Sequence, residues 1–167
     1  MVSRTEFTEQ GLNPLDSVEE ILSEQNWVFD RTDDDCLTVQ IKGRSCSYRL
    51  FFIWQKNLSA LQFTCEFDVS VRADNMALAS SALLDMNEES WMGHFEIARR
   101  TLVPSYRQTC LMKGYEFHES SAYLGDLIDI SLAHCERFYP VFELLSRKQP
   151  ANPEHLSLAL METAGES

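Results

Sequence analysis

Four ionisable side chains that could do chemistry gather within ten positions of one central stretch, MNEESWMGHFEI. They are Glu88, Glu89, His94 and Glu96, and carboxylates beside an imidazole are the groups from which metal sites and general acid–base pairs are built. However, no second histidine or cysteine lies at ligand spacing. Strand alternation places His94 and Glu96 together on a polar face, where a cross-strand residue such as Arg107 could meet them. We therefore favour a solvated face over a metal or acid–base site.

The other histidines and the neighbouring cysteine give no catalytic pair. His118, His134 and His155 are isolated in the sequence. His134 and Cys135 are adjacent on a predicted helix, so they face different directions and cannot act as a dyad. Cys135 belongs to the apolar stripe of that helix, where a cysteine is usually a small core residue rather than a nucleophile.

The remaining motifs do not support an enzyme either. Asp126 and Asp129 are three residues apart on the same helix and could share a cation, but the ligand order and glycine spacing of an EF-hand are missing. The chain has no GxSxG, no phosphate-binding glycine loop, no HExxH and no dinucleotide fingerprint. We predict a protein without catalytic residues, cofactor or bound metal.

Charge and composition restrict the possible partners. The chain has 167 residues and a formal net charge of −12, from 14 Lys+Arg against 26 Asp+Glu. Such an acidic surface repels phosphates and anionic lipids, so nucleic acid is not an expected partner. The basic candidates, Arg99–Arg100 and the turn with Lys42 and Arg44, are too small to reverse this.

The absence of long apolar runs and the spacing of the cysteines indicate the cellular compartment of the protein. No segment approaches the roughly 20 apolar residues of a membrane helix, and the start MVSRTEFTEQ has no apolar core of a signal peptide. The five cysteines are widely spaced and form no CxxC pair. Free thiols of this kind indicate a reducing cytoplasm, and we expect a cytoplasmic protein with no membrane contact.

Hydropathy patterns predict an α+β protein. Alternating or apolar runs predict about five to six strands, at residues 27–30, 35–42, 47–55, 60–67, 92–99 and 102–112. Helical stripes and caps predict helices that begin near Pro14, after Asp74–Asn75, at Ser120 and at Pro153 after the cap Asn152. Pro140 should kink the third helix or start a fresh segment.

We expect one domain with short extensions. Residues 1–13 form a flexible leader, residues 14–148 a single domain, and residues 149–167 a tail with a short amphipathic helix. That helix is too short to be stable alone, so it should dock on its own domain or on a partner.

The middle strand SYRLFFIWQ breaks the polar pattern of its outer face. Tyr48, Leu50, Phe52 and Trp54 form one face, but Phe51 and Ile53 lie on the other. Either another part of the chain covers them, or they contact a partner or a second copy, because contiguous exposed apolar patches mark interaction sites. Both alternatives stay open.

The opening stretch is best explained as a junction between a helix and a strand. Asn87 can adopt the left-handed conformation that ends a helix, and Gly93 permits a close approach. Phe95 and Ile97 should enter the core.

The sequence resembles the YbjN-like family of bacterial proteins, which are described as sensory transduction regulators. The resemblance rests on NPLDSVEEIL, LLDMNEESWMGHFEI, SYRQTCLM and CERFYPVFELL, with hallmark positions at Asn87, Gly93, Phe95, Arg107 and Pro140. It implies an antiparallel sheet flanked by helices, similar to type III secretion chaperones, which are commonly dimers and bind extended client segments. No catalytic residues are established for the family. One departure is ARRTL in place of a Gly- or Asp-containing hairpin turn, which predicts a looser turn with Arg99 and Arg100 at its tip.

Two functional hypotheses follow. The first is a chaperone-like, non-enzymatic regulatory module that binds an apolar segment of a partner protein through Phe51, Ile53 and Trp54, with Leu156 and Leu160 of the tail as a cover or clasp. The second is a small-molecule or metal sensor that uses His94, Glu96 and Arg107.

Overall fold

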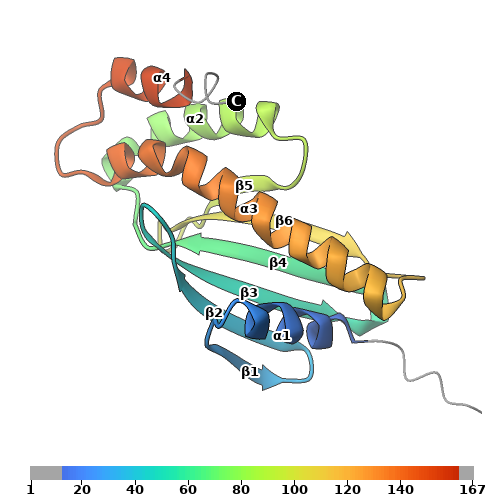
Figure 1. The fold of residues 1–167 in the computed structure, drawn as a ribbon. Coiled ribbons are helices and arrows are strands. Elements are labelled where there is room, and N and C mark those ends of the chain that lie inside the picture. The colour runs from blue at the N-terminus through green and yellow to red at the C-terminus, as the bar shows by residue number, and fades with distance from the viewer. Residues whose placement is uncertain (1–12, 162–167) are drawn as a thin grey trace, which may run out of the picture.

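The computed structural model describes residues 13–161, apart from the side chains of residues 117 and 118 (Figure 1). The strands are β1 (Phe29–Asp33), β2 (Cys36–Lys42), β3 (Ser47–Gln55), β4 (Ala60–Phe67), β5 (His94–Ile97) and β6 (Pro104–Leu111). The helices are α1 (Pro14–Glu24), α2 (Met76–Glu89), α3 (Phe117–Ser146) and α4 (Pro153–Met161), with short 3-10 turns η1 (Lys56–Leu58) and η2 (Ala73–Asn75). This confirms the predicted α+β class.

The strands form one antiparallel sheet in the order β1-β2-β3-β4-β6-β5. Alternating side chains made the three central strands predictable, because one face of each is apolar from end to end. The buried face carries Leu37, Val39 and Ile41 of β2, Leu50 and Phe52 of β3, and Leu61, Phe63 and Cys65 of β4.

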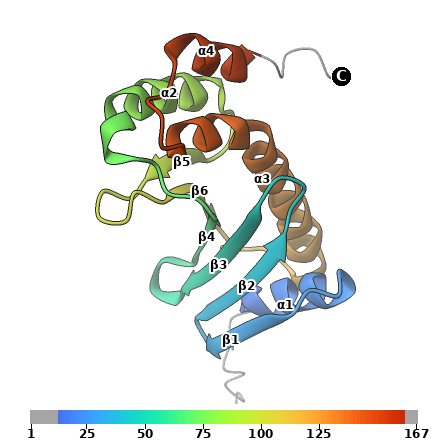
Figure 2. The same cartoon turned by 90° about the vertical axis from the view of Figure 1, so that its left-hand side faces the viewer.

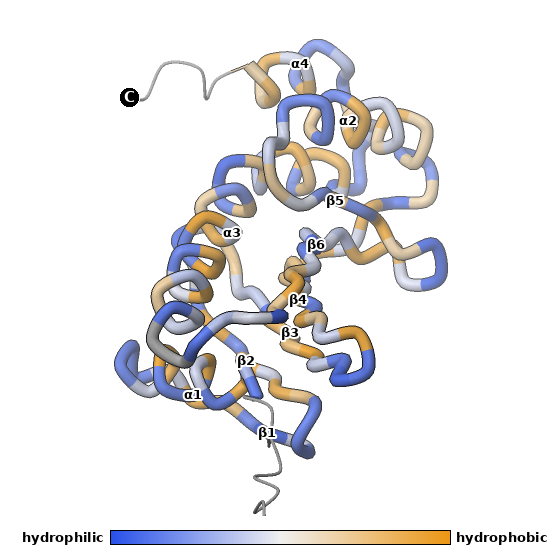
Figure 3. Tube along the Cα trace, turned by 90° about the vertical axis from the view of Figure 1, so that its right-hand side faces the viewer, coloured by the Kyte–Doolittle hydropathy of each residue, from blue (hydrophilic) through white to orange (hydrophobic). Residues whose placement is uncertain are grey.

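Helices α1 and α3 lie along this buried face of the sheet (Figure 2). Figure 3 shows the same arrangement from the opposite side, with hydrophobic and hydrophilic residues alternating along the strands. Aromatic rings join the two layers: the ring centroids of Phe67 and Phe142 are 4.8 Å apart, and those of Phe95 and Phe138 are 5.3 Å apart. The core therefore lies between the sheet and α3, with α1 closing the β1–β3 end.

Helix α1 begins where the sequence provides a cap. Asn13, the last residue of the predicted leader, accepts a hydrogen bond from Leu15 N–H, and Pro14 occupies the first turn. Residues 1–12 of that leader lie outside the described part of the chain.

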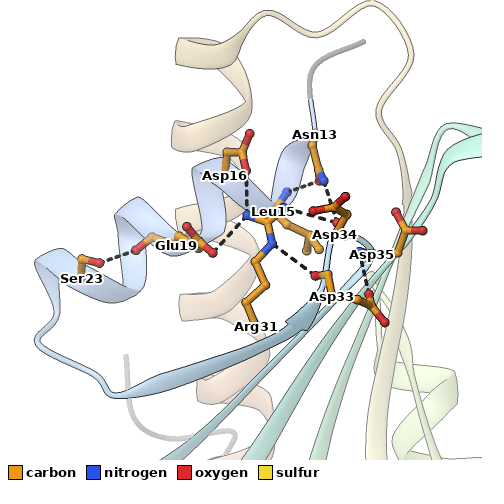
Figure 4. Close-up of polar contacts among 9 residues, drawn as sticks. All are labelled: Asn13, Leu15, Asp16, Glu19, Ser23, Arg31, Asp33, Asp34 and Asp35. Atoms are coloured by element: carbon orange, nitrogen blue, oxygen red, sulfur yellow. Dashed lines mark hydrogen bonds and ion pairs between the residues drawn. The ribbon is translucent and has the colours of Figure 1, made fainter. Parts of the chain in front are cut away.

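Arg31 of β1 ties this helix to the edge of the sheet (Figure 4). Its guanidinium lies 2.7 Å from the Asp16 carboxylate and 3.0 Å from that of Glu19, both on α1. It also donates to the backbone carbonyls of Asp33 and Asp34. The hydrogen bond to Asp16 is the main reason that the pKa of Arg31 is raised.

Helix α3 continues through Pro140, so of the two predicted alternatives, a kink or a fresh segment, the fresh segment does not occur. Pro140 lies on the exposed side of the helix. Phe138, Val141 and Phe142 on the other side are buried in the core on both sides of the proline. This packing holds one helix together despite the lost backbone hydrogen bond.

Asn75 has a different role from the predicted helix cap. Its side chain makes no capping bond to α2. It is buried, donates to Leu145 C=O at the end of α3 and accepts from Ala151 N–H. Asn75 thus connects the start of α2 with the segment that joins α3 to α4. Asn75 and Leu145 are 70 residues apart in the sequence, so no local sequence pattern reveals this contact.

Asn87 also differs from the prediction. It is helical rather than left-handed, and its side chain bonds twice to the backbone of Phe95: Phe95 N–H donates to Oδ1 at 2.7 Å, and Nδ2 donates to Phe95 C=O at 3.0 Å. The Asn87 side chain therefore bonds to the backbone N–H and C=O of a residue in β5, which is an edge strand of the sheet. Gly93 has φ +64°, and a Cβ there would collide with Tyr106, which confirms the expected close approach.

The β5–β6 connection is wide, as its sequence predicts. Ile97 pairs with Pro104, so six residues, 98–103, form the loop. Leu102 has φ +58°, and its carbonyl accepts from Val71 N–H. Arg99 and Arg100 are exposed in this loop.

Candidate functional site

The face of the sheet opposite the helices is not used by the core. We call it the open face. The cross-strand register assigns to it Asp30 and Asp33; Cys36, Thr38, Gln40 and Lys42; Ser47, Arg49, Phe51, Ile53 and Gln55; Ala60, Gln62, Thr64 and Glu66; His94 and Glu96; and Ser105, Arg107, Thr109 and Leu111. Among residues 13–161 no helix packs over this face: α1 and α3 lie on the other one, and α2 and α4 are stacked beyond the β5 end (Figures 1 and 2).

Phe51 and Ile53 lie in the middle of the open face, as the sequence predicted. Phe51 is flanked across the strands by Thr38 and Thr64, and it is partly exposed. Ile53 is 39% exposed. Two apolar side chains in neighbouring outward positions of a central strand are therefore open to contact.

The structure adds apolar side chains that the sequence analysis did not select. Leu111, at the end of β6, is 72% exposed, and Leu58 in η1 is 65% exposed. Leu111 pairs with Ala60, which pairs with Gln55 of β3, so Leu111 shares the end of the open face where Ile53 lies. The alternation of side chains along β6 places Leu111 on the outer face of this strand. Its position beside the β3 residues became clear only with the pairing of β6 and β4.

The other predicted contact residues are not part of this face. Trp54 pairs with Leu61 on the helix side of the sheet and packs against the core. Leu156 is buried on α4, and Leu160 is half-buried there, facing Leu78 and Ala82 of α2. The structure therefore keeps Phe51 and Ile53 together but separates them from Trp54 and from the tail, and α4 does not clasp the open face.

The predicted polar cluster does form. His94 and Arg107 are directly paired across β5 and β6, which confirms the expected cross-strand contact. Arg107 lies 3.3 Å from Glu96, and His94 Nε2 lies 3.4 Å from the same carboxylate. All three side chains are at least 38% exposed, and the Glu96 carboxylate already faces a cation. Within the described residues, no group of three or more His, Cys, Asp or Glu side chains is placed to hold a metal ion.

His134 and Cys135 face the core or its margin instead of a site. The His134 ring lies edge-on to Tyr106, and burial lowers its pKa. Cys135 is fully buried, and burial raises the pKa of its thiol well above the usual range. A thiol with a raised pKa is a poor nucleophile at neutral pH, so the structure supports the packing interpretation. The side chain of His118 lies outside the described residues.

Acidic side chains on the helix side form no cage either. Glu20, Glu24, Asp126 and Asp129 line a hollow of about 340 Å³ between α1 and α3. Asp126 and Asp129 are both exposed. This arrangement agrees with the predicted wet helix face.

A family comparison adds to this geometry. The model of the YbjN family, described as "Putative bacterial sensory transduction regulator", matches residues 14–144. The chain belongs to the YbjN family. That description supports a regulatory role and names no enzymatic activity.

A solved structure is similar to the chain as well. It is the crystal structure of YbjN from E. coli, described as "a putative transcription regulator". The identity is 12%, the TM-score is 0.49, and the match covers 73% of this chain and 90% of that one. No curated protein matches the sequence. Among the described helices, none has both the length and the apolar character to cross a bilayer.

Proposed function

We propose that this chain is a non-enzymatic, chaperone-like regulatory module that binds an apolar segment of a partner protein on the open face of its sheet. The observation that carries the proposal is the exposure of Phe51 and Ile53 in the centre of a face that no described element covers. A sheet that is packed on one side only normally has a polar second side. Apolar residues in that position are better explained by a contact than by folding.

The shape and chemistry of the face suit a protein segment more than a small ligand. Ile53 and Leu111 lie towards one end of the face, on β3 and β6 with β4 between them, and Phe51 lies beside Thr38 and Thr64 further along β3. The threonines on both sides of Phe51 offer hydroxyls to a partner's polar groups. Burial of an exposed Ile or Phe side chain stabilises a complex by about 1.5–3 kcal/mol before the entropic cost of association. The five free cysteines support action in a reducing compartment such as the cytoplasm.

The test is capture of partners by open-face variants. Phe51→Ser and Ile53→Ser should each lose proteins that co-purify with the wild-type chain from its native cell, and a partner identified in this way should bind the variants at least about tenfold more weakly. Leu84→Ser is the matched control, because Leu84 is a 74% exposed leucine on α2, away from the face. Circular dichroism and urea unfolding check that all three variants fold. Equal capture by wild type, Phe51→Ser and Ile53→Ser would contradict the proposal.

A sensor at His94, Glu96 and Arg107 is the second candidate, because β5 and β6 bring these three residues together. It requires a ligand that competes for the Glu96 carboxylate with the Arg107 guanidinium. Calorimetric titration with Zn²⁺ and Ni²⁺, together with metal analysis of the purified protein, tests this function. A metal-free protein that gives no binding heat removes the metal sensor.

A further inference from the structure

The open face is closer to charge balance than the rest of the molecule. It carries three cationic side chains, Lys42, Arg49 and Arg107, against four carboxylates, Asp30, Asp33, Glu66 and Glu96, so its formal charge is −1. The chain as a whole carries −12. Two copies of such an acidic protein repel each other in most orientations. They repel each other least when they approach through this face.

Arg49 and Glu66 make the face self-complementary. They are directly opposite each other on β3 and β4. Within the described residues, neither forms an ion pair with any side chain. A hollow of about 320 Å³ lies beside them, and its lining includes a second unpaired carboxylate, Asp68. This hollow is thus lined by two carboxylates and one guanidinium, and one more cationic side chain would neutralise it.

We propose that the occupant of the open face is a second copy of this chain, in a two-fold dimer in which Arg49 of each copy pairs with Glu66 of the other. A two-fold contact uses the same patch on both copies, so a surface with an adjacent unpaired cation and anion can satisfy both at once. In this arrangement each Arg49 enters the hollow of the other copy. Because Arg49 and Glu66 are direct cross-strand neighbours, β3 of each copy lies over β4 of the other, so Phe51 faces Thr64 and Ile53 faces Gln62 across the contact. The inference rests on the proposed function in one respect, that the open face is a contact surface, and it names the occupant of that face.

The face approaches the size that a stable dimer uses. Six strands at a spacing of about 4.8 Å span roughly 25 Å, and strands of seven to nine residues at about 3.3 Å per residue are roughly 25 Å long. The projected area is therefore roughly 600 Å², and side chains make the accessible area larger. A standard stable interface buries about 800 Å² per partner.

The β5 edge is less suited to self-association. An open edge strand pairs readily with a strand of another chain. In β5, the outward N–H and C=O of Phe95 are both bonded to the Asn87 side chain. Strand addition there would have to break these two bonds, whereas the open face is free in the described structure.

Charge exchange between Arg49 and Glu66 tests the dimer. The wild type should sediment as a dimer in analytical ultracentrifugation at micromolar concentration. Arg49→Glu alone gives two facing carboxylates, and Glu66→Arg alone gives two facing guanidiniums, so each variant should dissociate at least about tenfold more readily.

Mixing and combining the two exchanges should restore the contact. In an equimolar mixture of the two variants a heterodimer should form, because the introduced carboxylate of one chain then faces the introduced guanidinium of the other. The native Glu66 of the first chain likewise faces the native Arg49 of the second. Both exchanges on one chain should recover the homodimer. Circular dichroism confirms that each chain is folded.

The outcomes separate this inference from the proposed function. A wild type that stays monomeric at several hundred micromolar, or a dimer that neither single exchange weakens, overturns the two-fold dimer. If partner capture from the cell is still lost in Phe51→Ser, the proposed function stands with a different occupant. If the exchanges behave as expected but capture does not depend on Phe51, the dimer stands and the client-binding function fails.

Discussion

At the scale of single residues, Gly93 and Gly114 allow a comparison of backbone strain with steric collision. Both have positive φ, +64° and +85°. A Cβ at Gly114 would meet nothing within 4 Å, whereas a Cβ at Gly93 would collide with the Tyr106 side chain and lie 2.8 Å from the Arg107 carbonyl. Tyr106 cannot move away easily, because it is buried and its hydroxyl donates to Met92 C=O at 2.6 Å.

We expect Gly114→Ala to lower the free energy of unfolding by about 1–2 kcal/mol, which is the cost of a left-handed conformation for a residue with a Cβ. Gly93→Ala should cost at least about 3 kcal/mol, since overpacking adds to the same conformational penalty. Urea unfolding of both variants measures the difference. An equal loss in the free energy of unfolding for the two variants would show that Tyr106 moves to accommodate the added Cβ without a measurable penalty.

Several residue roles could not be predicted because they depend on distant partners. Asn75 and Asn87 were both interpreted as helix-end residues, which is the usual local role of asparagine. In the structure their side chains bond to the backbone of Leu145 and Phe95, groups that the fold brings near. By contrast, the pairing of His94 with Arg107 could be predicted, since two strands that follow each other in the sequence without an intervening helix usually pair antiparallel.

At the scale of elements, the strands with an uninterrupted apolar face were predictable almost to the residue. Residues 47–55 and 60–67 agree with β3 and β4. The prediction of the edge strands was less accurate: the sequence placed the first strand at 27–30, but β1 is Phe29–Asp33. Only Phe29 of that strand packs against the core, so its position depends on pairing and on Arg31 rather than on hydropathy. The docking of α4 on α2 and α3 was one of the predicted alternatives, but sequence alone could not choose between its own domain and a partner.

Arg31 is the residue through which β1 and α1 hold each other, and its loss should be costly. Its side chain is 21% exposed and contacts two carboxylates and two backbone carbonyls. We expect Arg31→Met to reduce the free energy of unfolding by about 1.5–3 kcal/mol, because partly buried, charge-assisted hydrogen bonds are lost at several sites.

Arg72→Met is the matched control for this prediction. Arg72 forms a single ion pair with Asp74, and both side chains are exposed, so the substitution should change the free energy of unfolding by less than about 0.5–1 kcal/mol. Urea unfolding measures both variants, and hydrogen exchange of β1 amides localises the effect. If Arg31→Met is no more destabilising than Arg72→Met, the ion pairs to α1 do not hold the edge of the sheet.

At the scale of the whole molecule, charge is distributed unevenly between the two sides. The open face carries a formal charge of only −1, whereas Glu20, Glu24, Asp126 and Asp129 on the helix side have no ion pair within the described residues. The surplus of negative charge therefore lies on the helix side, which faces solvent in the proposed dimer. Repulsion within this layer opposes the compact state.

This asymmetry predicts that salt stabilises the folded chain. Raising the ionic strength from about 10 mM to 150 mM shortens the screening length from about 30 Å to about 8 Å, which weakens the repulsion among 12 excess negative charges. We expect the free energy of unfolding in urea to rise by about 1 kcal/mol over this range. Measurement in the Arg49→Glu variant, at low protein concentration, separates folding from association.

Neutralising the acidic helix side should have the same effect as salt. A variant with Glu20→Gln, Glu24→Gln, Asp126→Asn and Asp129→Asn lowers the net charge from −12 to −8, because 22 acidic residues then face 14 basic ones. It should be more stable at low salt and respond less to added salt. Asp16→Asn removes one negative charge as well, but it should destabilise the chain because that carboxylate pairs with Arg31 at 2.7 Å. Stability that falls with salt, or an equal salt response in the four-fold variant, would show that local ion pairs rather than net repulsion govern the electrostatics of this fold.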